Sequence, residues 1–181
     1  TIDGSHQFNS VQLINSAVLT HSPSPTTKLE LTSKTFVIDT TSRIDLTGKG
    51  HLPTSVVTGS SGGSYGGLGG IYVDGGTTNT VFGSSTLPTD FGIGGTGSGG
   101  QTYGGGAIKL TTDNLILNGK IIADGQGFNT FFNSQGGGSG GSALLDVGVL
   151  QGSGTLESSG GSGCTFYGGG GGGGGRIAVY Y

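Results

Sequence analysis

Residues 107–110 read AIKL and residues 115–125 read LILNGKIIADG, so short apolar runs alternate with an Asn-Gly and an Asp-Gly pair. The same order returns in residues 143–160, and residues 177–181 begin it a third time. Short apolar runs bounded by such pairs are typical of β-strands joined by tight turns. No segment has the three-and-four spacing of a helix, so the chain is predicted to be all-β.

A glycine fixes how the copies of this unit align. When Ile44, Ile121 and Leu156 are superposed, a glycine follows four residues later in every copy. Repeats of a few tens of residues indicate stacked units that bury one another's apolar faces. We therefore expect a parallel β-helix, or solenoid, of short strands with packed extended polyglycine tracts. It should form one domain over residues 1–181, with the glycine-rich residues 51–106 inserted over the side of the stack.

The strand pattern is clearest in the first half of the chain. Residues 28–32 alternate between polar and apolar side chains, which places two leucines on one face. Residues 36–39 and 43–48 continue in the same style and are predicted as further short strands.

Glycine dominates the composition, with 44 glycines and 4 prolines among 181 residues. Such a bias without a collagen-like period often signals disorder. Against disorder stand a charged content of only 9% and a mean hydropathy near zero. Phe and Tyr are concentrated among the glycines, where large rings are good anchors. We expect the tracts to be packed as extended chains, so that Gly171→Val should be strongly destabilising.

Charge and cysteine content exclude several classes of protein. A net charge of −3 with only seven Lys and Arg argues against a nucleic-acid partner. No apolar run approaches the ~18 residues of a membrane span. The single Cys164 cannot form an internal disulfide, which leaves a buried side chain or a thiol available to another chain.

Little in the sequence points to chemistry. The three histidines, His6, His21 and His51, lack metal-ligand spacing. Two stacked carboxylates could make a glycosidase pair or a calcium site; the candidates are Asp39, Asp45, Asp124, Asp146 and Glu157. The glycine-aspartate signature of calcium-binding β-rolls is missing, so we predict no cofactor, with calcium as an alternative that no motif supports.

Aromatic side chains in the inserted stretch offer a different site. Tyr65, Tyr72 and Tyr103 lie among glycines and could form a sugar-stacking surface facing a ligand. The alternative is that these rings pack internally over the glycine-rich backbone.

The order of motifs resembles the glycine-rich repeat modules of very large bacterial surface proteins. The similarity covers nearly the whole chain and rests on SRIDLTGKG at residues 42–50, GGSYGGLGG at 62–70, GGSGGS at 137–142, and the glycine run that ends in RIAVYY at 176–181. It implies an extracellular or cell-surface module used many times in a row, and it carries over no catalytic or ligand residues.

Two functions follow as hypotheses. In the first, the chain is a non-enzymatic structural unit of a surface fibre or giant surface protein, whose partners are other copies of itself or neighbouring repeats. Unpaired terminal strands would join the units head to tail, through Thr1, Ile2, Ile177, Val179 and Tyr181. In the second, the chain is an adhesin or carbohydrate-binding module that holds surface glycans.

Overall fold

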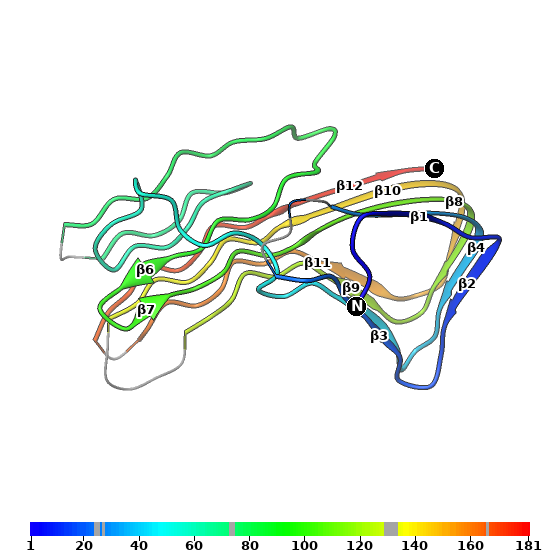
Figure 1. Ribbon diagram of the computed structural model, residues 1–181, viewed down its shortest axis with the longest axis horizontal. Helices are drawn as coiled ribbons and strands as arrows, with labels where there is room; N and C mark the ends of the chain where they lie inside the picture. Colours follow the sequence, from blue (N-terminus) through cyan, green and yellow to red (C-terminus); the bar gives the residue numbers. More distant parts are fainter. Residues whose placement is uncertain (24–25, 27, 73–74, 129–133, 166) are drawn as a thin grey trace.

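The computed structural model describes residues 1–23, 26, 28–72, 75–128, 134–165 and 167–181. One end of the elongated molecule holds two main sheets, and extended glycine-rich segments run side by side to the other end (Figure 1). The described residues contain strands and no helix, which confirms the all-β class. None of them belongs to a helix capable of crossing a membrane.

The larger sheet, called sheet A, consists of parallel strands in the order β1-β4-β8-β10-β12, with β2 also paired to β4. Its strands are β1 (Ser5–Gln7), β2 (Ser10–Leu13), β4 (Leu29–Ile38), β8 (Ala107–Leu117), β10 (Ser142–Gln151) and β12 (Arg176–Tyr180). β4 joins most of residues 28–32 and 36–39, which the sequence pattern predicted as separate strands, into one strand.

Sheet B is also parallel, in the order β11-β9-β5-β3. Its strands are β3 (Val18–Leu19), β5 (Arg43–Asp45), β9 (Lys120–Ile122) and β11 (Thr155–Glu157). Ile44, Ile121 and Leu156 are register neighbours across this sheet, which confirms the alignment of the repeats. A third, antiparallel pair joins β6 (Thr96–Gly97) to β7 (Gly100–Gln101).

The long strands of sheet A turn a corner near their middle. In β8, Thr112 and Leu115 are buried, whereas the intervening Asp113 and Asn114 are both exposed. Two consecutive outward residues shift the inward positions by one, because side chains otherwise alternate along a strand. The register places Lys34 of β4 at the same corner, next to the exposed Asp113.

The apolar core lies between sheets A and B. Each inward-facing row of register neighbours, here called a ladder, presents one side chain from each of its strands to this core. The central ladder contains Val11, Phe36, Leu115 and Leu150. Its two middle members are fully buried. The core also includes Leu19, Leu29, Leu31, Ile38, Ile44, Leu46, Ile108, Leu110, Leu117, Ile121, Ala123, Ala143, Leu145 and Val147.

The glycine-rich segments form a hydrogen-bonded bundle rather than further sheets. Along residues 169–175, Gly170 and Gly173 donate to the carbonyls of Ser60 and Gly63, three residues apart. Gly172 and Gly175 donate to Gly161 and Ser158, again with a period of three. Extended chains with three residues per turn point their amide groups sideways in several directions. Each segment can therefore bond several neighbours at once.

Exposure to solvent along residues 169–175 follows the same period of three. Gly171 and Gly174 face outward, while Gly170 and Gly173 are buried. A β-carbon on Gly171 would meet only the Gly161 carbonyl oxygen, at 3.8 Å. Gly171→Val is therefore the wrong substitution to test close packing, because this residue lies on the outside of a tract whose neighbours are packed.

The prediction of a parallel β-helix is wrong. The strands belong to several separate sheets, one of them antiparallel, and the strand order does not describe a solenoid. The sequence pattern led us to expect extended glycine tracts packed over the side of a regular stack of coils. In the structure they lie in a bundle whose neighbours are not consecutive in sequence: residues 60–63 bond both 137 and 170.

Candidate functional site: the open edges of the two sheets

Sheet A has an edge that is only half paired. β12 pairs with residues 142–146 of β10, and β8 pairs with β10 as far as Gln151. Within the part of the chain that the structure describes, no strand pairs with residues 147–151 on the β12 side. Sheet B likewise ends at β11. Unpaired strand edges of this kind can accept another strand.

Apolar side chains are exposed along this edge for a definite reason. Leu150 is 39% exposed although its ladder neighbour Leu115 is fully buried. The difference arises because β4 and β10 flank Leu115 on both sides, whereas no strand of the described residues lies beyond β10 beside Leu150. Val149 is 45% exposed but pairs with the exposed Asn114, so it points to the outer face. Leu150 is thus the open end of the core.

The opposite edge of sheet A is open as well. Val11 and Leu13 of β2 pack against the core but are only partly buried. A hollow of about 320 Å³ lies beside them, lined mainly by apolar residues: Ile2, Phe8, Ser10, Val11, Gln12, Leu13, Leu19 and Leu31. The core is therefore exposed at both ends of its ladders.

The sequence-predicted interface residues are divided between these two edges. Ile2 is partly buried against the core and donates its N–H to the carbonyl of Thr20, next to the exposed Thr1. Ile177 and Val179 continue two inward-facing ladders on β12, and Tyr181 is 88% exposed. Sequence reasoning missed Leu150 and Val11. Their signal was present in the alignment of β2 with β4, β8 and β10, which the repeat comparison did not extend to residues 10–13.

The predicted ligand-facing tyrosines lie differently from one another. Tyr65 is fully buried, with its ring 5.0 Å from that of Phe82 and the Arg176 guanidinium 5.6 Å from its centroid. Tyr65 therefore presents no ring to a ligand at the surface. Tyr72 is 37% exposed and lies against Gly168, where a β-carbon would overlap its ring. Tyr103 is partly buried and bonds Gln126 through its backbone.

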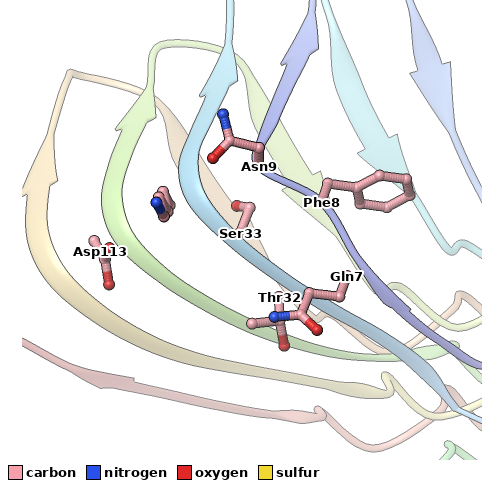
Figure 2. Close-up of a pocket in the computed structure, with 7 residues that line it drawn as sticks. Gln7, Phe8, Asn9, Thr32, Ser33 and Asp113 are labelled. Atoms are coloured by element: carbon pink, nitrogen blue, oxygen red, sulfur yellow. The ribbon is translucent and has the colours of Figure 1, made fainter.

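A polar groove of about 520 Å³ follows the corner of sheet A (Figure 2). Its lining residues are Gln7, Phe8, Asn9, Thr32, Ser33, Lys34 and Asp113. Ser33 donates a buried hydrogen bond of 3.1 Å to the hydroxyl of Thr112, its register neighbour on β8. This lining brings a single carboxylate into the groove, whereas a glycosidase needs two.

The other carboxylates make local contacts. Asp39 accepts from the backbone of Asn15 and Thr41, and these hydrogen bonds hold its pKa well below the usual range. Burial raises the pKa of Asp124, and the charge of Glu157 acts in the same direction. Among the described residues, no three His, Cys, Asp or Glu side chains form a group that could hold a metal ion.

His21 and His51 both contact the ring of Phe91. Their rings lie edge-on to it, with centroid-to-centroid distances of 5.7 and 4.9 Å respectively. The exposed His6 stacks with Phe8 instead. Cys164 is buried and forms no disulfide. Two of the histidines thus pack against Phe91, and the open edges remain the strongest candidate site.

Comparison with known proteins gives no independent indication of function, because no family model, curated protein or solved structure matches this chain.

Proposed function

We propose that the protein is a non-enzymatic structural module of an extracellular or cell-surface assembly, joined head to tail to other copies of itself or to neighbouring repeats. The exposure of Leu150 carries this proposal. A core ladder whose middle members are fully buried ends at this leucine, and covering it would remove apolar surface from water.

Both edges suit the same kind of contact. The edge at β10 and β11 and the edge at β2 and β3 belong to the same ladders, so one edge presents the side chains that the other needs. Val11 and Leu150 end one ladder, and Leu19 and Leu156 end another. Joining the two edges continues the core from one copy to the next, and a contact between unlike surfaces extends into a filament.

The glycine bundle supports a scaffold more than a binding surface. Tyr65 is buried and Tyr72 lies on a glycine, so these rings stabilise the bundle. Many of its glycines have no room for a β-carbon. A closely packed, hydrogen-bonded bundle of this kind suits a structural part.

The experiment measures assembly of the purified chain by sedimentation velocity and electron microscopy over a wide range of concentrations. Wild-type protein should form oligomers that lengthen with concentration. Leu150→Lys places a charge at the open end of the core and should keep the protein monomeric. Val149→Lys adds the same charge on the outer face and should assemble like wild type. A wild-type protein that stays monomeric at millimolar concentration would overturn the proposal.

A further inference from the structure

Direct joining of two copies meets a steric conflict. If β2 of a second copy lies beside the free half of β10 in the register of the sheet, its Val11 lies next to Leu150 and its Leu19 next to Leu156. β1 of the second copy then falls on the place that β12 of the first copy already occupies. Both strands hold the same register positions, because His6 of β1 and Val179 of β12 belong to one ladder. One of the two strands must leave.

β1 is the weaker strand of the two. It has three residues, all exposed, and it places the polar His6 in the ladder next to Leu31. β12 has five residues and places Val179 in that ladder, next to Leu145. A valine in a buried aliphatic ladder gains free energy from burial, whereas an imidazole there loses hydration.

We propose that neighbouring copies assemble by strand exchange, in which β12 of one copy replaces β1 beside β4 of the next. Val179 then lies next to Leu31 of the second copy, and Ile177 next to its Leu29. β2 and β3 of the second copy cover Leu150 and Leu156 of the first. The inference rests on the proposed function and names the partner as a second copy of this chain.

The segment before β1 must open in the same step. The Ile2–Thr20 hydrogen bond holds Thr1 beside Thr20 of its own chain. By the register of sheet B, Thr20 belongs to the same row as Glu157 of β11. When the two copies are joined, Glu157 of the first copy takes the place of Thr1 beside Thr20 of the second. Asp3 now holds the segment closed, because its carboxylate accepts two hydrogen bonds of 2.7 Å from Ser22. Residues 1–7 therefore cover an edge that the neighbouring copy would otherwise occupy.

A disulfide lock tests the exchange on the full chain. Gln7 and Thr32 are register partners between β1 and β4, and Figure 2 shows their side chains lying together. Neighbouring strands are about 4.8 Å apart, within the ~4.4–6.8 Å between the Cα atoms of disulfides. The variant Gln7→Cys/Thr32→Cys, when oxidised, ties β1 to its own β4. The control Gln12→Cys/Val37→Cys ties β2 to β4, a pair that the exchange leaves intact.

Assembly of both variants is compared with and without reductant by sedimentation velocity. The β1 lock should stay monomeric when oxidised and should assemble like wild type after reduction. The β2 lock should assemble in both states. If the oxidised β1 lock assembles as fast as its reduced form, the exchange is wrong while the proposed function stands. If neither variant nor wild type assembles in any state, both are wrong.

Discussion

A β-carbon on Gly172 would overlap the carbonyl oxygen of Gly138, so these two segments touch backbone to backbone. The neighbouring Gly171 faces solvent. Gly172→Ala should therefore destabilise the protein by about 1–3 kcal/mol or more through overpacking. Gly171→Ala should be neutral or stabilising by up to about 1 kcal/mol, because alanine restricts the unfolded chain. Urea denaturation measures both, and equal effects at the two positions would contradict the threefold arrangement.

The stability of the fold should depend on pH through His21. Its ring is buried and can donate from Nδ1 to the Ser22 carbonyl at 2.7 Å while Nε2 accepts the Ala107 N–H at 3.3 Å. Protonation of Nε2 would remove that acceptor. Burial lowers the pKa of His21 below its ordinary value of 6.5. The unfolded chain thus binds a proton near pH 6.5 before the folded chain does, so stability is complete above this pH and falls below it.

The measurement is the urea midpoint between pH 8 and pH 5. Burial also lowers the pKa of His51, which adds a contribution of the same sign. His6→Gln alters an exposed histidine and should leave the decline as steep as in wild type. A midpoint that stays constant or rises on acidification would rule out the buried neutral histidine.

Asp124 should affect the pH dependence of stability in the direction opposite to that of His21. Its pKa is raised above 3.8 by burial and by the charges of Glu157 and Asp45, so its ionised form is disfavoured in the fold. Asp124→Asn removes the charge and can keep the acceptor for the Ser159 N–H. The variant should melt at a higher temperature than wild type at pH 7. The gain should shrink as pH falls through the folded-state pKa towards 3.8, because wild type then becomes neutral too. A gain unchanged at low pH would mean that charge is not its cause.

Mutations of Ser33 and Thr112, which share a hydrogen bond at the corner of sheet A, should have coupled effects on stability. Thr112→Val leaves the buried Ser33 hydroxyl without this acceptor and should cost about 1–3 kcal/mol. Valine itself fits this ladder, since Val147 is the next member. The double variant with Ser33→Ala should therefore lose less than the sum of the single variants, by about 0.5–3 kcal/mol. Strictly additive effects in a thermodynamic cycle would show that the bond contributes nothing.

The sequence predicted local features of the fold better than their arrangement. Alternation and turn pairs were enough to identify β-strands and to align Ile44, Ile121 and Leu156, because both depend on neighbouring residues. The path of the glycine tracts could not be predicted in this way. Glycine has no side chain to mark an inward face, so residues 169–175 carry no pattern that distinguishes a regular stack from a bundle bonded on several sides.

The candidate site, too, could be predicted from the sequence only in its local features. Ile177 and Val179 were recognisable as strand residues with an apolar face. The exposure of Leu150 was not, because it depends on which strands lie on either side of β10 in the folded sheet. For Tyr65 the sequence left a ligand-facing ring and an internally packed ring as alternatives, because only the folded bundle shows that Phe82 and Arg176 lie against its ring.

The period of three in the glycine bundle constrains how this chain can change during evolution. One residue added within 169–175 would rotate everything after it by about a third of a turn and turn the inward positions outward. Three added residues would restore every contact direction and lengthen the segment by one turn. In any sequence that shares this fold, the corresponding tract should therefore differ in length by multiples of three, and residues larger than glycine should accumulate at the positions equivalent to Gly171 and Gly174.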